Sequence, residues 1–234
     1  MYCAAYYVKS VTDCLRQNFI VPDRGGPLNH TGYHAKVNPF RKECMQVEEK
    51  EQYIQKLFPR INDIKDVDIR EKVISVWWGA WKESAFAKIE DLSQWEPAKE
   101  KLNISNVEHT NQMVECAIAI AQVVEREQNV KINMDTLIAA SILHDADKIL
   151  MFDPSSGKTT PMGTYLPHTG IAGHLALQAG LPMEIVHAIA SHSTHYSSLP
   201  PKTPEAVILS NADHLMTELW TIFRNIETSF DLKD

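Results

Sequence analysis

"LIAASILHDADKIL", Leu137 to Leu150, is an apolar stretch that ends in a cluster of charged and polar side chains. Its first seven residues are almost entirely apolar, as expected for a buried helix. The next five, His144-Asp145-Ala146-Asp147-Lys148, bring one histidine, two aspartates and one lysine together. Charge in a helical core is costly unless it is paired or bound to a metal ion. The segment therefore predicts a helical core with a polar centre.

Helical patterns extend from this segment in both directions. Apolar residues recur at helical spacing, Gly and Pro residues separate the runs, and no alternating strand pattern of useful length occurs. Pro182 is expected at the first position of its helix. The sequence thus predicts an all-α protein. The expected helices cover about residues 1–22, 45–58, 67–86, 106–128, 133–151, 167–180, 182–194 and 203–226.

The pattern divides the chain into three parts. Residues 1–104 are expected to form a mainly helical N-terminal extension with a long loop at 23–41, which is rich in Gly, Pro, Asn and His. Residues 105–226 form the core with the polar cluster, and 227–234 form a tail. Three tryptophans lie within residues 77–81 and predict packing in a core or at an interface between subunits. A homo-oligomer is therefore compatible with the sequence.

Composition excludes several classes of partner. Hydrophobic residues make up 44% of the 234 residues, and the net charge is −7. An acidic chain argues against a nucleic-acid groove or an anionic membrane surface, because both require a basic face. No uninterrupted apolar run is long enough for a membrane span, and the N-terminus lacks the features of a secretory signal. The four cysteines form no C-x-x-C pair, which favours a cytoplasmic location.

Ten histidines are the compositional peculiarity of the chain, and four of them recur at helix-length intervals. The gaps from His109 to His144, His168, His192 and Asp213 are 35, 24, 24 and 21 residues, each about one helix plus a turn. Helical bundles build metal sites from inward side chains on facing helices. Four imidazoles and two carboxylates without a thiolate suit a first-row divalent metal. They exceed one catalytic tetrahedral zinc site but suffice for two octahedral ions that share a carboxylate.

The ordered set H…HD…H…H…D, with a lysine three residues after the HD aspartate, resembles the HD-domain superfamily. The stretch Leu166–Ser193, LPHTGIAGHLALQAGLPMEIVHAIASHS, is similar to the part of HD hydrolases that supplies the third and fourth histidines. The resemblance covers about residues 105–216. It implies an HD helical bundle, with the mainly helical N-terminal segment as an addition.

The resemblance also implies a ligand set and a chemistry. Two divalent transition metals, Fe, Mn or Co with Zn as a further option, would share Asp145 and lower the pKa of a bridging water. The chain would then be a metal-dependent phosphohydrolase that acts on a small phosphorylated metabolite or nucleotide through a metal-bound hydroxide. The first metal would be held by His109, His144, Asp145 and Asp213, and the second by Asp145, His168 and His192.

Further candidate site residues follow from their spacing. Lys148 lies one helical turn after His144, so both share a face and the ammonium can bind a substrate anion; a solvated cation at a helix end is the alternative. His195, three residues after His192, is expected beside the ligands or facing the substrate. The loop 152–166 is expected either to shape the substrate pocket or to be a flexible surface loop. The predicted catalytic residues are Lys148, Asp145 and His195, and the predicted substrate-binding residues are Lys148, Lys158 and Tyr165.

Other polar residues near the predicted ligands are expected to take no part in the site. Asp147 is expected to face solvent. His174 and His187 lie in mid-helix, off the ligand spacing, and His214 directly follows Asp213, so that it should point elsewhere.

The same ligand order serves a second chemistry. HD-type di-iron oxygenases, which cleave a C–C or C–P bond of a small polyol or phosphonate, also have a lysine after the HD pair, so Lys148 does not discriminate between the two. Hydrolysis of a non-phosphate bond is a third option. A regulatory domain without turnover is disfavoured, because all six ligands are present.

Overall fold

The computed structural model of the chain describes residues 42, 45–193 and 197–224, and the contacts discussed below lie in the unit that begins at Gln46. Helices dominate these residues, and the β-structure among them consists of two isolated bridges, Ser93 to Ser105 and Phe152 to Thr159. The all-α prediction is confirmed. No helix in the described part of the chain combines the length and apolarity needed to cross a bilayer. The predicted helix 1–22, the loop 23–41, the tail 227–234 and His195 lie outside the described residues.

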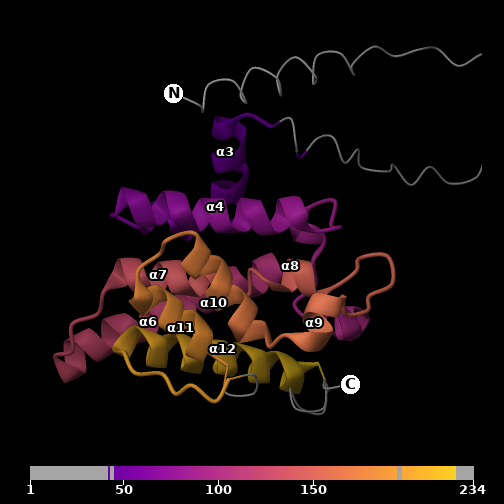
Figure 1. Cartoon of the computed structure of the whole chain (residues 1–234). Helices are drawn as coiled ribbons and strands as arrows, with labels where there is room; N and C mark the ends of the chain where they lie inside the picture. Colours follow the sequence, from indigo (N-terminus) through magenta and orange to yellow (C-terminus); the bar gives the residue numbers. More distant parts are fainter. Residues whose placement is uncertain (1–41, 43–44, 194–196, 225–234) are drawn as a thin grey trace, which may run out of the picture. The chain divides into compact units, whose positions relative to one another are not determined.

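Ten helices with short connections are described, and Figure 1 shows their arrangement. Three 3-10 turns, Pro59–Asp63, Ile89–Asp91 and Glu96–Ala98, join some of them. The helices are α3 (Val47–Leu57), α4 (Val67–Glu83), α5 (Lys99–Leu102), α6 (Asn106–Gln128), α7 (Met134–Leu143), α8 (Lys148–Met151), α9 (Pro161–Tyr165), α10 (His168–Gln178), α11 (Met183–Ser191) and α12 (Pro204–Phe223).

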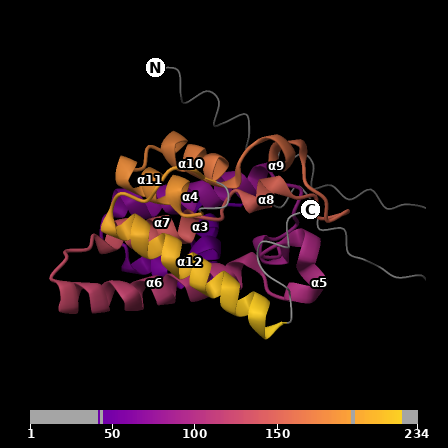
Figure 2. The same cartoon turned by 90° about the horizontal axis from the view of Figure 1, so that it is seen from below.

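Helix α7 is the centre of the bundle. It packs against α4, α6, α11 and α12, and every residue from Thr136 to Leu143 is buried. This explains why its sequence is apolar on all sides, since a helix enclosed by others needs no polar face. Helix α4 lies along one side of the bundle, between α3 and α7, and α6 packs against α12 (Figures 1 and 2). The polar cluster that follows α7 therefore lies in the interior of the described bundle.

The tryptophan-rich segment belongs to the core of this chain. Trp77 is fully buried, stacks on Phe58 with ring centroids 4.7 Å apart, and donates its indole N–H to the carbonyl of Ile142 at 3.0 Å. Trp81 is also buried, whereas Trp78 is half-buried. The hydrogen bond from Trp77 ties α4 to the last turn of α7, directly before the polar cluster.

The observed boundaries of α6 and the start of α11 lie within one residue of the positions predicted from the sequence. Ser105 and Glu108 form a capping box at the start of α6, and Asn129 ends the helix with a left-handed φ of 54°, as the predicted range 106–128 requires. Pro182 caps α11 from one position outside the helix and is not its first residue. The prediction for Pro182 was thus wrong by one position.

The predicted continuous helix 133–151 is wrong. Helix α7 ends at Leu143, residues 144–147 form a turn, and α8 begins at Lys148. Within this turn the amides of Ala146 and Lys148 donate to the carbonyls of Leu143 and Asp145, each at 3.1 Å and each three residues back. This tighter winding is that of a 3-10 turn, and it changes the directions of the side chains in the cluster.

Trp77→Ala is expected to lower the free energy of unfolding by about 3–5 kcal/mol, because it leaves a cavity and an unpaired carbonyl beside α7. Trp78→Ala is the matched control and is expected to cost less than about 2 kcal/mol, because that ring is half-buried. Denaturant unfolding of both variants measures the difference. An equal loss of unfolding free energy in both variants would show that Trp77 contributes no more to the core than Trp78 does.

Candidate metal centre

Four long helices and the turn after α7 bring all six predicted ligands together. His109 lies in the first turn of α6, His168 is the first residue of α10, and His192 directly follows α11. The imidazoles and Asp145 are buried, whereas the Asp213 side chain, on α12, is 17% exposed. The sequence therefore identified a real cluster, and Asp213 marks its most accessible edge.

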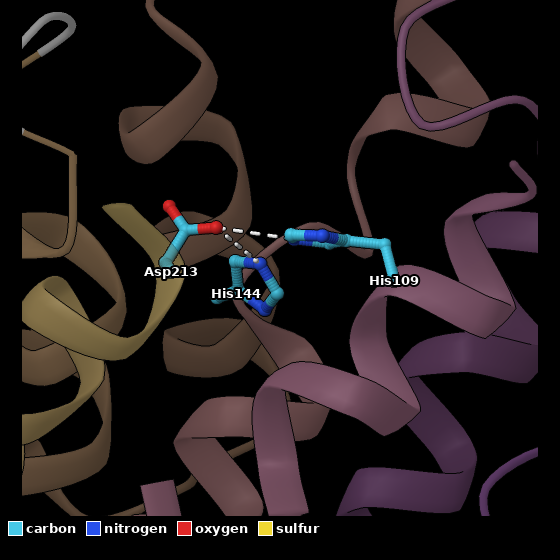
Figure 3. A group of neighbouring side chains, drawn as sticks. All are labelled: His109, His144 and Asp213. Atoms are coloured by element: carbon cyan, nitrogen blue, oxygen red, sulfur yellow. Dashed lines mark hydrogen bonds and ion pairs between the residues drawn. The ribbon is translucent and has the colours of Figure 1, made fainter. Parts of the chain in front are cut away.

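One half of the cluster gathers around Asp213. Its Oδ1 lies 3.1 Å from His109 Nε2 and 3.6 Å from His144 Nε2. Figure 3 marks both contacts with dashed lines. Oδ2 of Asp145 lies 3.3 Å from His144 Nε2 and 3.8 Å from His109 Nε2. Two carboxylates thus face two imidazole nitrogens, and His109, His144 and Asp213 lie close enough together to bind one ion.

The other half uses the second oxygen of Asp145. Oδ1 lies 3.0 Å from His168 Nε2, and that nitrogen lies 3.2 Å from His192 Nε2. Two imidazole nitrogens on one ion lie roughly 3.0–3.4 Å apart when the metal–nitrogen bonds are about 2.1 Å long. The His168–His192 spacing fits that arrangement. Asp145 consequently offers one oxygen to each half of the cluster.

The hydrogen bonds of the rings determine which nitrogens face the centre. The Nδ1 atoms of His144 and His192 contact the carbonyls of Ser141 and Ile189 at 2.8 and 2.6 Å. A carbonyl only accepts, so both Nδ1 atoms carry hydrogen and the Nε2 atoms point inward. His144 Nε2 has no hydrogen-bond partner among the described residues. Inward-facing imidazole nitrogens beside carboxylates form a donor set that fits a divalent transition metal.

The side chains of the centre by themselves hold protons at the positions where cations would bind. Burial lowers the pKa of His144 and of His168, but the facing carboxylates outweigh it and raise the two values to about 10 and about 9. Burial and the neighbouring histidines lower the pKa of His192 to about 3. Burial raises the pKa of Asp145, but His144 and Lys148 hold it well below its usual range. The centre therefore keeps its carboxylates charged.

Lys148 faces the centre, as predicted from the spacing. It is buried, and its Nζ donates to Asp145 Oδ2 at 2.7 Å and to the carbonyl of Gln94 at 3.2 Å. The alternative of a solvated lysine at a helix end is wrong. The buried ammonium offsets part of the negative charge that Asp145 brings into the core.

Asn106 and Gln94 join this network and were missed at the level of sequence. Asn106 Nδ2 donates to Asp145 Oδ2 at 3.3 Å and to Gln94 Oε1 at 3.2 Å. Asn106 lies three residues before His109 on the same helix, and this shared face was the available signal. Gln94 comes from an irregular segment without a pattern, so no sequence signal pointed to it.

Asp147 is the clearest correction. It was expected to face solvent, but its side chain is fully buried and both carboxylate oxygens lie 2.9 Å from His168 Nδ1. Burial raises the pKa of Asp147, and the contact with His168 opposes that change. The physical reason for the inward position is the turn at 144–147, which replaces the expected helix.

The remaining predicted site residues lie away from the cluster or cannot be placed. Lys158 and Tyr165 are exposed, Tyr165 by 83%, and neither makes a hydrogen bond or ion pair with the six residues. Their substrate-binding roles stay predictions. His174 is exposed, and His187 accepts a hydrogen bond from the Lys202 amide at 2.9 Å, so both lie outside the cluster, as expected.

Comparison with known proteins agrees with this geometry. Residues 106–218 match the family model of the HD domain. The chain is also similar to the dihydroneopterin 2',3'-cyclic phosphate phosphodiesterase of Methanocaldococcus jannaschii, with 27% identity over 179 residues, which cover 68% of this chain and 67% of the relative. No solved structure matches the chain significantly.

Metal binding is expected to release protons. With pKa values of about 10 and about 9, His144 and His168 are protonated at neutral pH in the metal-free protein, and a metal must displace these protons. The apparent affinity for Mn²⁺ should rise about tenfold per pH unit for each displaced proton as long as the pH lies below those values. Calorimetric titration in buffers of different ionisation enthalpy measures the release. An affinity that does not change with pH would contradict the expected ligands.

Proposed function

We propose, from the premise that this chain belongs to the HD superfamily of metal-dependent hydrolases, that it is a phosphohydrolase with two metal ions. The observation that supports two ions is the division of the Asp145 oxygens, Oδ2 toward His144 and Oδ1 toward His168, at 3.3 and 3.0 Å. In the proposal, His109, His144, Asp145 and Asp213 hold the first ion, and Asp145, His168 and His192 hold the second. Fe, Mn, Co and Zn all suit this ligand set.

The metal pair would neutralise charge on a phosphoryl group and activate water for attack on phosphorus. The protein prepares the site for that chemistry through its own side chains. Asp145 places a permanent negative charge in the core, and Lys148 and Asn106 hold one of its oxygens by hydrogen bonds. The geometry of the bridge is thus set before any ligand arrives, which reduces the reorganisation that the reaction requires.

Lys148 is proposed as the contact for the substrate anion. Its ammonium has three N–H donors, and Asp145 and Gln94 accept two of them in the described part of the chain. The third is left for a phosphoryl oxygen. Substrate is expected to approach past Asp213, because that side chain is 17% exposed while its neighbours are buried. His195 is proposed as a further catalytic residue because it lies three residues after His192 in the sequence.

A phosphate diester of a small metabolite is the proposed substrate class. The relative from M. jannaschii acts on a 2',3'-cyclic phosphate, and this favours a diester over a monoester or a non-phosphate bond. The net charge of −7 fits a compact anion, since only the local cations of the centre can attract it. Cyclic 2',3'-phosphates are therefore the first compounds to test.

We also propose a cytoplasmic location without nucleic-acid partners, which the cysteine spacing and the net charge of −7 favour. A homo-oligomer is proposed from the tryptophan-rich segment of the sequence. The di-iron oxygenase is the alternative function. No observation on the described residues favours it over hydrolysis, whereas the similarity to a phosphodiesterase favours hydrolysis.

Asp145→Asn is expected to abolish hydrolysis of cyclic 2',3'-phosphates and of bis(p-nitrophenyl) phosphate, because both proposed ions lose their shared ligand. The expected fall in kcat/KM exceeds about 100-fold, more than removal of an outer hydrogen bond causes. The assay uses protein purified anaerobically and loaded with Fe²⁺, Mn²⁺, Co²⁺ or Zn²⁺. His174→Ala, an exposed histidine on α10, is the matched control and should leave the rate unchanged. Oxygen uptake with a polyol or phosphonate, without diester hydrolysis by the metal-loaded protein, would sink the hydrolase proposal.

Lys148→Met is expected to lower kcat/KM about 10- to 100-fold while both metals stay bound, because a charged hydrogen bond to the substrate is lost. Lys131→Met, at an exposed lysine before α7, is the control for the loss of a charge. Metal analysis and steady-state kinetics on the same samples separate substrate binding from metal loss. A variant with wild-type kinetics would remove Lys148 from the site.

A further inference from the structure

Among the described residues, the outer nitrogens of three histidine rings, those of His144, His168 and His192, contact a partner, and they do so in two different ways. His144 and His192 follow the last residues of α7 and α11, and each ring uses the carbonyl three residues earlier. His168 is instead the first residue of α10, so no carbonyl of its own helix precedes it. Its Nδ1 contacts the carboxylate of Asp147, which lies 21 residues earlier in the chain.

The carboxylate of Asp147 is paired with the His168 ring. Its side chain is fully buried, and its ion pair in the described part of the chain is with His168, at 2.9 Å. Although Asp147 occupies the N-cap position of α8, its side chain makes no capping hydrogen bond there. A buried carboxylate without a strong partner would destabilise the fold. Its pairing with the outer nitrogen of a predicted ligand therefore indicates a function at the centre.

The charges of the two halves explain why only one ring needs a carboxylate. The half around His109 and His144 has Asp213 as a ligand of its own, in addition to the shared Asp145. Among the described residues, the half around His168 and His192 has two imidazoles and one carboxylate, the shared Asp145. In addition, Lys148 is paired with Asp145 and offsets its charge. Without a further anion, the His168 half would be the poorer site for a divalent cation.

We infer that Asp147 is a positioning residue that orients the His168 ring and supplies the negative charge needed to retain a cation between His168 and His192. This inference rests on the dinuclear centre of the proposed function. Asp147 acts through the imidazole, since its oxygens contact Nδ1, the nitrogen on the far side of the ring from the centre. An outer carboxylate of this kind orients the ring and makes it a stronger donor to a metal.

The test compares Asp147→Asn and Asp147→Ala with the wild type by Mn²⁺ titration and by metal analysis after dialysis. Asparagine keeps an acceptor for the ring but removes the charge, and alanine removes both. The wild type is expected to bind two ions. In Asp147→Asn the ion proposed between His168 and His192 should bind about 10- to 100-fold less tightly, and the affinity for the other ion should be unchanged. The loss should be larger in Asp147→Ala. Asp153→Asn, at a carboxylate that bonds Ser155, is the matched control.

Spectroscopy separates positioning from a purely structural role. Paramagnetic resonance of the Mn²⁺-loaded wild type should show two coupled ions, and Asp147→Asn should show one isolated ion. The unfolding midpoints of the two proteins are compared without metal, where they should agree, because a bound ion itself stabilises the fold. If the variants fail to fold, nitrogen-15 NMR of the metal-loaded wild type still decides: His168 should carry hydrogen on Nδ1, and a proton on Nε2 would overturn the inference.

The outcomes distinguish this inference from the function on which it rests. Two ions in the wild type, bound equally well by Asp147→Asn, would overturn the role of Asp147 and leave the dinuclear centre standing. Equal weakening of both ions would also overturn it, since that is the result of general damage to the fold. Fewer than two ions in the wild type would overturn the dinuclear proposal together with the inference. Lack of hydrolysis with two ions bound would overturn only the proposed reaction.

Discussion

The structure depends on one buried negative charge, the carboxylate of Asp145. It lies in the middle of a helical core with a cationic or polar group at each of its oxygens: Lys148 at 2.7 Å and His144 at 3.3 Å from Oδ2, and His168 at 3.0 Å from Oδ1. Such a charge is tolerated only when its neighbours compensate for it. His144, His168 and Lys148 provide this compensation, and the proposed metals would add to it.

The positions at which the helices begin and end bring these side chains to Asp145. Helix α7 is buried from Thr136 to Leu143 and ends there, so His144 and Asp145 lie in the core as part of a turn. His168 starts one helix and His192 follows the end of the next, which brings both to the same place. These terminal positions also determine what each Nδ1 atom contacts. A histidine after the end of a helix can reach the carbonyl three residues earlier in that helix, whereas the first residue of a helix has no such carbonyl. The contact between Asp147 and His168 is a consequence of that asymmetry.

Much of the centre could be predicted from the sequence, and the failures have physical causes. The gaps between His109, His144 and His168 are close to whole helices plus turns, so regular helix geometry was sufficient to bring the candidate ligands together. Asp147 was misplaced because the pattern predicted a helix through the cluster, where a carboxylate at the helix end is usually solvated. Gln94 was missed because its contact with Lys148 spans 54 residues and begins in an irregular segment. Periodicity identifies what lies on helices, whereas contacts from turns and loops depend on the packed structure.

The central claim is that Asp145 bridges two cations, and anomalous diffraction from crystals of the Mn²⁺-loaded protein tests it most directly. The account predicts two anomalous peaks on either side of the Asp145 carboxylate, one bonded to Oδ2 together with His109, His144 and Asp213, and the other bonded to Oδ1 together with His168 and His192. A single peak shared by the imidazoles, or peaks that do not contact Asp145, would contradict it.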